Sequence, residues 1–407
     1  MHILIIHQAF ASLDESGGTR HYEFARLLAA NGHPVTIIGS PVSYLTGVIS
    51  GSDAEGSDQK TVSEGQKVEN LTILRAKVYS AHHRSFFHRI IAFVTFMFSS
   101  FLLGIKVKDV DLVWGTSPPI FQGVTAWALA RMKRVPFLLE IRDLWPLFAV
   151  AVGVLKNPIL VGASEWLERN LYQRAGAVMI NSPGFMDHVI SRGARRVELI
   201  PNGSDPAMFD PGKDGGVFRA AHNLEGKFVV LYAGAHGISN DLEVVLESAS
   251  LISNARIQIV LLGDGKEKRN LQDRAKELGL NNVIFLPPIP KSKIPEALAA
   301  TDACLAILKP LPEYKTTYPN KVFDYMAAGR PVILAIDGVI RGVIDEAGCG
   351  IFVEPGDPDS LAKAIDQLAV DPARGRKMGL AGQEYLENHF SRAKIGKRLI
   401  QFLEELV

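Results

Sequence analysis

The feature that most constrains the fold is an alternation of short apolar runs with amphipathic segments, which begins twice along the chain. The first series opens with MHILIIH, continues through HYEFARLLAANG, which ends at Gly32, and returns to HPVTIIG. The second opens with KFVVLYAG and continues through DLEVVLESASLI to RIQIVLLGDG. Nearly continuous apolar runs are typical of parallel strands buried on both faces, which need helical crossovers. The chain is therefore expected to be α/β, with two doubly wound parallel sheets.

The length of 407 residues also favours two domains, because a single hydrophobic core rarely grows beyond about 250–300 residues. A Gly-, Pro- and Asp-rich stretch between the two series is typical of a linker. We predict an N-terminal domain at 1–203, a linker at 204–225 and a C-terminal domain at 226–385. A last helical segment, 386–407, is expected to pack back toward the first domain. Ligands are expected at the carboxyl ends of the strands, in a central cleft that the domains face.

Composition and motifs exclude several classes of protein. The 44 basic and 43 acidic residues are balanced, whereas nucleic-acid binders usually carry a positive excess. No G-x-G-x-x-G fingerprint follows either opening strand, so a dinucleotide-binding oxidoreductase is disfavoured. No His, Cys and Asp cluster has the spacing of metal ligands, and the acidic pair Asp357 and Asp359 is more typical of a helix cap. The two cysteines form no disulfide framework.

The stretch YPNKVFDYMAAGRPVI, at 318–333, predicts a helix with well-defined ends. Pro319 lies where a first helical turn begins, and Gly329 lies where a C-terminal cap is expected. An apolar stripe occupies one side, while Lys321 and Asp324 project from the other. The unpaired N–H groups and the macrodipole of a helix N-terminus favour a bound anion.

The segment IIAFVTFMFSSFLLGI at 90–105 carries no charge and has basic flanks. It is shorter than the roughly 20 apolar residues that cross a bilayer. Two interpretations stay open: a helix at 86–105 that lies in the membrane interface, or a core helix of the first domain. In the first interpretation, anionic headgroups contact the basic residues Arg84, Arg89, Lys106 and Lys108.

Nine stretches together resemble one known family. They are GGTRHYEFARLLAANGHPVTII, SPPIFQG, EIRDLWP, EWLERNLYQRA, INSPGF, IPNGSD, LYAGAHG, LLGDGKEK and YPNKVFDYMAAGRPVI. The chain resembles the retaining glycosyltransferases of family 4, and among them the WbuB-like branch that builds bacterial surface polysaccharides. The resemblance covers essentially the whole chain. It implies the GT-B fold, in which two Rossmann-like doubly wound domains face a central cleft.

The resemblance implies a site for the diphosphate of a nucleotide sugar at the helix that opens at Pro319. The family motif has two glutamates separated by seven residues, and the second binds the ribose hydroxyls. Asp324 matches this second position, whereas Thr316 occupies the first. The usual arginine of the loop AGAHG is replaced by His236, so the cations expected at the phosphates are Lys309, Lys315 and Lys321. The donor-binding residues expected are Gly18, His236, Gly237, Gly263, Gly265, Lys309, Thr316, Asn320, Lys321 and Asp324.

Catalysis is expected at Arg142 and Asp143 in EIRDLWP, where the family frequently has His-Asp. A retaining transfer passes through an oxocarbenium-like state while the leaving diphosphate gains charge. A carboxylate near the sugar and a cation near the diphosphate each stabilise that state. The resemblance implies front-face attack by the acceptor hydroxyl, without a covalent intermediate, a metal ion or another cofactor.

The resemblance also implies the partners and the location. The donor is a nucleotide-diphosphate sugar, such as an N-acetylated amino sugar or a deoxy sugar. The acceptor is a polyprenyl-diphosphate-linked saccharide in O-antigen or capsule synthesis. The enzyme is expected on the cytoplasmic face of the inner membrane, against its anionic surface. The alternative is a catalytically degenerate GT-B protein that binds a membrane or a partner, which the missing first glutamate would suit; turnover of a nucleotide sugar distinguishes the two.

Overall fold

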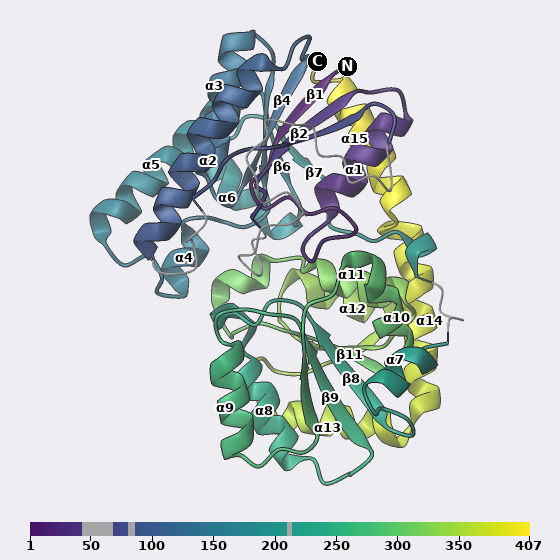
Figure 1. The fold of residues 1–407 in the computed structure, drawn as a ribbon. Coiled ribbons are helices and arrows are strands. Elements are labelled where there is room, and N and C mark those ends of the chain that lie inside the picture. Colours follow the sequence, from purple (N-terminus) through teal and green to yellow (C-terminus); the bar gives the residue numbers. More distant parts are fainter. Residues whose placement is uncertain (43–67, 80–85, 210–213) are drawn as a thin grey trace. The chain divides into compact units, whose positions relative to one another are not determined.

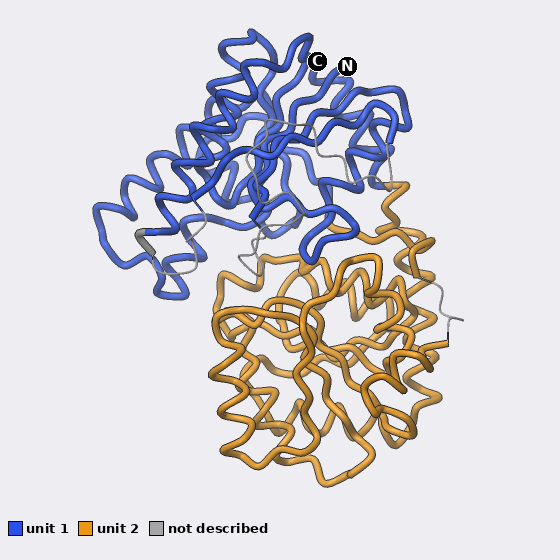
Figure 2. The backbone as a smooth tube through the Cα atoms, viewed as in Figure 1, with its two compact units in different colours: residues 1–201, 395–407 blue, residues 202–394 orange. Residues whose placement is uncertain are grey.

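The computed structural model describes residues 1–42, 68–79, 86–209 and 214–407. The chain divides into two compact units, each with its own sheet (Figure 2). Unit 1 contains residues 1–201 and 395–407, and unit 2 contains residues 202–394. Arg84, one of the predicted membrane contacts, lies outside the described residues.

Unit 1 is built on a parallel sheet that has seven strands among the described residues. Their order is β3 (Leu71–Arg75), β2 (Val35–Gly39), β1 (Ile3–Ile6), β4 (Leu112–Ser117), β5 (Phe137–Ile141), β6 (Ala177–Ile180) and β7 (Val197–Leu199). The inner strands are buried along their whole length, as the continuous apolar runs predicted. The carboxyl ends of β1, β4 and β5 therefore meet at one edge.

Helices cover both faces of this sheet. One face carries α2 (Phe86–Lys106), α3 (Phe121–Lys133) and α5 (Pro158–Arg174), which pack side by side (Figure 1). The other carries α1 (Arg20–Ala30), against which the C-terminal part of α15 (Arg392–Glu404) packs through Gly396 and Leu27. The short elements are α4 (Leu147–Ala151), η1 (Pro183–Phe185) and α6 (Met186–Ser191).

Unit 2 has a second parallel sheet, with six strands among the described residues. Their order is β10 (Val283–Leu286), β9 (Ile257–Leu262), β8 (Phe228–Ala233), β11 (Ala303–Ile307), β12 (Val332–Ala335) and β13 (Gly350–Phe352). Alternate residues of β8 pack in the two hydrophobic cores on opposite faces of the sheet. Val229 and Leu231 belong to one core, and Val230 and Tyr232 belong to the other. The sheet is thus buried on both faces, and the α/β prediction with two parallel sheets is confirmed.

The helices of unit 2 form two layers. One contains α8 (Leu242–Leu251), α9 (Lys268–Glu277) and α13 (Pro358–Val370). The other contains α10 (Ile294–Ala299), α11 (Asn320–Ala327), α12 (Val339–Ala347) and α14 (Pro372–His389). The short helices are η2 (Pro206–Met208), α7 (Gly216–Ala221), η3 (Ile238–Asn240), η4 (Lys291–Lys293) and η5 (Pro312–Thr316). Asp357 caps α13 through the N–H of Ser360, as the sequence predicted for this acidic pair.

Candidate functional site

Two glycine-rich loops of unit 2 touch backbone to backbone at the carboxyl ends of β8 and β9. A Cβ atom on Gly263 would lie 1.8 Å from the carbonyl oxygen of Gly234, and one on Gly265 would lie 2.3 Å from that of His236. Gly234 and Gly263 also have φ angles of +152° and +150°, which residues with a side chain rarely adopt. Only glycine fits at these positions, so the loops present backbone groups to whatever lies beside them.

The ring of His236 lies at the junction of these loops and is fully buried. Neither of its nitrogens has a hydrogen-bond partner. Burial lowers its pKa to about 4, and the nearby charges of Lys268 and Lys321 act in the same direction. The imidazole is therefore neutral at physiological pH. Buried polar atoms without partners are rare in folded proteins, and here they indicate a place where a ligand makes the missing hydrogen bonds.

The helix α11 begins beside these loops, as the sequence predicted. Pro319 occupies the N-cap and offers no side-chain cap. The Nζ atom of Lys321 lies 3.7 Å from the centroid of the Tyr232 ring, and a Cβ atom on Gly234 would lie 2.8 Å from it. Among the described residues, this ammonium group has no carboxylate partner, and burial lowers its pKa to about 7. A cation without a counter-ion at a helix N-terminus is arranged to receive an anion.

The carboxylate of Asp324 is already engaged inside unit 2. Its Oδ1 accepts a hydrogen bond from Ser204 at 2.8 Å, and its Oδ2 accepts one from Lys291 Nζ at 2.5 Å. Asn320 Nδ2 lies 3.4 Å from the same Oδ2. A carboxylate has about four acceptor positions, so a ribose bound here has to share this group with Lys291 or displace it. The predicted ribose contact stays a prediction, with this added constraint.

The other predicted donor residues of unit 2 are distributed over neighbouring loops. The hydroxyl of Thr316 donates to the carbonyl oxygen of Glu313 at 2.6 Å within η5. Lys309 follows β11, and its N–H donates to the carbonyl oxygen of Ser239 at 3.0 Å.

Lys315 lies on the surface, whereas Gly237 directly follows the buried His236. The side chain of Lys315 is 58% exposed and pairs with Asp337 at 2.8 Å, so it is a surface charge with its own counter-ion. The backbone N–H of Gly237 donates to Asn240 Oδ1 at 3.3 Å.

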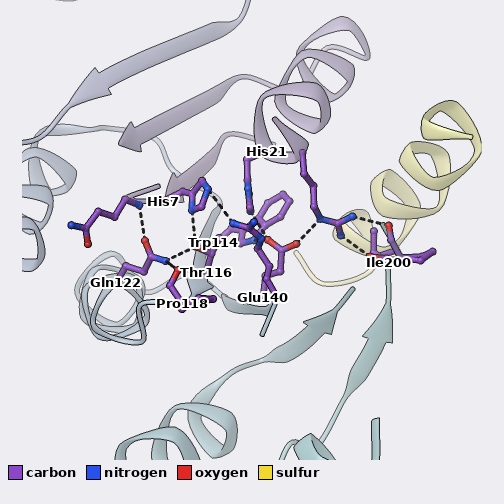
Figure 3. Close-up of polar contacts among 12 residues, drawn as sticks. His7, His21, Trp114, Thr116, Pro118, Gln122, Glu140 and Ile200 are labelled. Atoms are coloured by element: carbon purple, nitrogen blue, oxygen red, sulfur yellow. Dashed lines mark hydrogen bonds and ion pairs between the residues drawn. The ribbon is translucent and has the colours of Figure 1, made fainter. Parts of the chain in front are cut away.

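In unit 1, a buried carboxylate organises the edge where β1, β4 and β5 end (Figure 3). Glu140 receives hydrogen bonds from His21 Nε2 at 2.5 Å, Arg20 Nε at 2.8 Å and Trp114 Nε1 at 3.2 Å. Arg20 also donates to the carbonyl oxygens at 200–201. Burial alone would raise the pKa of Glu140, but His21 and Arg20 hold it well below its usual range. Burial lowers the pKa of His21 and Glu140 opposes that shift, whereas Arg20 is always charged and supplies the permanent counter-charge of Glu140.

The guanidinium of Arg142 is held by His7, which directly follows β1 and is fully buried (Figure 3). Arg142 NH1 lies 3.4 Å from His7 Nε2, and a guanidinium can only donate, so Nε2 is the unprotonated acceptor. The proton of His7 is then on Nδ1, 2.9 Å from Thr116 Oγ1, which also accepts from Gln122. A Cβ atom on Gly18 would lie 3.6 Å from Arg142 NH2. The predicted residues Gly18 and Arg142 are therefore adjacent.

Asp143 is the next residue along the chain, and its side chain is exposed. Among the described residues, no hydrogen bond or ion pair engages its carboxylate. Neighbouring protein atoms raise the pKa of Asp143 to about 6, whereas its access to water opposes that shift, so we expect it to be ionised at neutral pH. An ionised and uncommitted carboxylate beside a fixed guanidinium can act on charge that develops in a reacting group.

Comparisons with known proteins give family matches over most of the chain. A family model described as glycosyl transferase 4-like domain matches residues 17–203, and one described as glycosyl transferases group 1 matches residues 217–385. WcaI of Escherichia coli (strain K12), named for colanic acid biosynthesis as a glycosyl transferase, is 24% identical over 397 residues and is covered over 94% of each chain. This chain belongs to the family 4 glycosyltransferases.

Solved structures give the same fold for the glycosyltransferase. Sucrose-phosphate synthase from Thermosynechococcus elongatus matches with a TM-score of 0.79 at 19% identity, covering 100% of this chain and 99% of that one. HepE from Anabaena, solved in complex with UDP-glucose, matches with a TM-score of 0.72 at 17% identity over 100% of both chains. At these identities the likeness establishes the fold, and the GT-B prediction is confirmed.

The apolar helix α2 of the glycosyltransferase is packed on its own domain along one face and exposed along the other. Its stretch His88–Lys106 is, among the described helices, the one long and apolar enough to cross a membrane by length and composition, yet only 22% of it is buried. The inner face packs on α3, where a Cβ atom on Gly104 already meets Leu129 at 2.4 Å. The outer face leaves Phe98 and Leu102 61% and 62% exposed. Neither sequence alternative describes this helix completely.

Sequence reasoning missed several residues of the glycosyltransferase's site. Glu140 carried a signal, because a carboxylate inside the apolar run PFLLEI has to be paired to be buried. His7 follows the first strand, and His21 lies just after the loop that comes next. A single histidine in a sequence does not show whether it lies in the core or in a binding site. Lys291 carried no signal, because its contact with Asp324 joins η4 to α11, which are distant in sequence.

Proposed function

We propose that this glycosyltransferase is a retaining enzyme that transfers a sugar from a nucleotide-diphosphate donor to a lipid-linked saccharide in surface polysaccharide synthesis. The observation that carries the donor assignment is Lys321, a partly buried cation beside two glycine loops and a helix N-terminus, for which the described part of the chain supplies no counter-ion. Nucleoside diphosphates carry the charge that this arrangement lacks. The relative HepE, which was solved with UDP-glucose, supports the same donor class.

The division of labour between the units follows from their charges. Unit 2 offers Lys321 and the neutral His236 for the phosphates, so the proposal needs no metal ion or other cofactor. Unit 1 offers Arg142, fixed by His7, and the exposed Asp143 for charges that develop during transfer. In the proposed reaction the acceptor hydroxyl attacks the front face of the sugar, the diphosphate leaves, and the configuration is retained. One cation and one carboxylate suit this reaction better than a pair of carboxylates.

The acceptor and the location are proposed from the relatives and from α2. WcaI is named for colanic acid biosynthesis. The family resemblance implies that such polymers are assembled on lipid carriers. The exposed apolar face of α2, with Arg89, Lys106 and Lys108 on and beside it, supports peripheral binding to an anionic membrane surface. The proposed acceptor is therefore a polyprenyl-diphosphate-linked saccharide at the cytoplasmic face of the inner membrane.

A thermal-shift panel of nucleotide sugars and their parent nucleotides tests the donor assignment. We expect one nucleoside diphosphate and its sugar, including the N-acetylated amino and deoxy sugars, to raise the melting temperature. A ligand at 100 times its dissociation constant stabilises by about 2.7 kcal/mol, which this method detects readily. Turnover of the same donor distinguishes an enzyme from a degenerate binding module. If no nucleoside diphosphate stabilises the protein, the donor site is assigned wrongly.

Vesicle binding tests the proposed location. The double variant Lys106→Ala, Lys108→Ala should bind anionic vesicles more weakly by about 1 kcal/mol for each lysine removed, and high salt should weaken the parent protein in the same way. The matched control is Lys276→Ala, Lys293→Ala, which removes two exposed lysines of unit 2. Equal binding by both double variants would exclude a membrane role for the α2 flank.

A further inference from the structure

The helix α5 presents an apolar stripe to solvent. Ile159 is 78% exposed and Trp166 is 65% exposed, and they are separated by seven residues, which is two helical turns. Gly162 and Ala163 lie between them on the same side and are also exposed. Positions i, i+3, i+4 and i+7 form one face of a helix, so the first turns of this exposed face carry no polar side chain, whereas its continuation carries Arg169.

The opposite face of α5 packs on the core through Leu171 and Tyr172, and it also carries one buried carboxylate. Glu168 is fully buried there, where it accepts a hydrogen bond from Tyr172 at 2.9 Å and one from His188 at 2.8 Å. Arg192 lies 3.2 Å from its second oxygen. A helix on the surface of a water-soluble domain normally places polar residues on its outer face, as the last turns of α5 do. The first turns of α5 depart from this pattern, because their outer face is apolar, and they are therefore suited to a less polar surrounding.

The exposed stripe continues into neighbouring elements of unit 1. Val150 on α4 and Val154 in the following turn are about 40% and 41% exposed, and Leu160 is 43% exposed. The α4–α5 tip is defined here as Val150, Val154, Ile159, Leu160 and Trp166. It belongs to the same helical layer as α2 and α3, which Figure 1 shows on one face of the sheet.

The charges around this layer have one predominant sign. The segment from 86 to 174 contains ten Lys and Arg residues against six Asp and Glu residues, in a chain whose net charge is only +1. On α5 itself Glu168 is buried and Glu165 lies 3.6 Å from Arg192, whereas Arg169 and Arg174 are exposed. Apolar side chains beside exposed basic residues complement an anionic bilayer surface, and tryptophan favours the interface between headgroups and acyl chains.

We propose that the α4–α5 tip is a second membrane-contacting element, which inserts its apolar side chains into the interface of an anionic bilayer independently of the basic flank of α2. The inference extends the proposed membrane location and does not depend on the sugar or the acceptor. Because α5 keeps its inner face on the domain, the contact is peripheral, and only the outer stripe enters the lipid.

Vesicles of phosphatidylglycerol and phosphatidylethanolamine provide the test. Ile159→Ser should lower the partition of the protein into these vesicles about fivefold, because the side chain loses most of its transfer free energy. The matched control is Val370→Ser on α13 of unit 2, which alters a residue that is 80% exposed and should leave partition unchanged. Both residues are exposed, so the melting temperatures should match that of the parent protein.

Quenching by brominated phospholipids gives a second measurement. Tryptophan fluorescence of the parent protein should fall on binding, and Trp166→Phe should reduce this fall, because Trp166 is 65% exposed whereas Trp114 is buried and Trp127 and Trp145 are only partly exposed. An unquenched parent protein, or Ile159→Ser partition equal to that of Val370→Ser, would overturn the inference. If the double variant Lys106→Ala, Lys108→Ala still weakens vesicle binding in that case, the proposed membrane location stands and only this inference fails. Concentration-dependent dimers that Ile159→Ser abolishes without lipid would instead assign the tip to a second copy of the chain.

Discussion

Replacing Asp143 by asparagine should lower turnover about 10²–10³-fold, the usual effect of removing one group that stabilises transition-state charge. Asparagine keeps the shape of the side chain and removes only the charge. Because the exposed carboxylate has no partner among the described residues, its loss should leave the fold and the melting temperature unchanged. Donor affinity should change less than about twofold, since a charge used mainly in the transition state acts on rate.

The control for this variant is Asp187→Asn. Asp187 is an exposed aspartate on α6 of the same unit, and its replacement should leave turnover unchanged. The measurement is the initial rate of nucleoside diphosphate release from the donor that the thermal-shift panel identifies. Ordinary turnover by Asp143→Asn would exclude the catalytic role and leave Arg142 as the remaining candidate.

The fold followed from the sequence to the level of individual strands. The apolar runs that begin at MHILIIH and KFVVLYAG became β1 and β8, because a strand buried on both faces has little choice of residue type. The helix at Pro319 was also predictable, since proline and glycine fix its ends locally. The sequence was less informative at α2, because a core helix and a helix in the membrane interface have the same apolar composition. In the structure α2 has one packed and one exposed face.

The candidate site was predictable only where local backbone geometry decides it. Gly263 and Gly265 were expected from the family resemblance, and the close approach of two loops explains why no side chain fits at these positions. The partners of Asp324 could not be found, since Ser204 and Lys291 are brought to it by the tertiary fold. The same holds for the tautomer of His7, which depends on Thr116 and Arg142 at distant positions.

Replacing Lys321 by methionine should weaken the nucleoside diphosphate about 10- to 100-fold, in line with about 1.5–3 kcal/mol for a hydrogen bond to a charged group. Binding of the nucleoside alone should change little, because the lysine interacts with the phosphates. Methionine keeps the packing on Tyr232 without the charge. Lys315→Met is the matched control, since Lys315 is exposed and already paired with Asp337.

The pKa of Lys321 adds a pH dependence to this binding. In the free protein its pKa is about 7, and a bound diphosphate raises it. The contribution of the charged lysine is therefore complete below about pH 7 and is lost as the pH rises through the higher pKa of the complex. Between these two values, binding must take up a proton.

Calorimetric titration of the nucleoside diphosphate at pH 8, in two buffers of different ionisation enthalpy, tests the donor site most directly. The parent protein should take up about 0.4–0.8 proton per ligand bound, and Lys315→Met should do the same, because a 10- to 100-fold effect of the charge raises the pKa of the lysine by about 1–2 in the complex. Lys321→Met should take up no proton, and at this pH, where the free lysine is mostly neutral, it should bind about 2- to 10-fold more weakly. Equal affinity and equal proton uptake by Lys321→Met and the parent would contradict the assignment of the diphosphate to this lysine and the helix behind it.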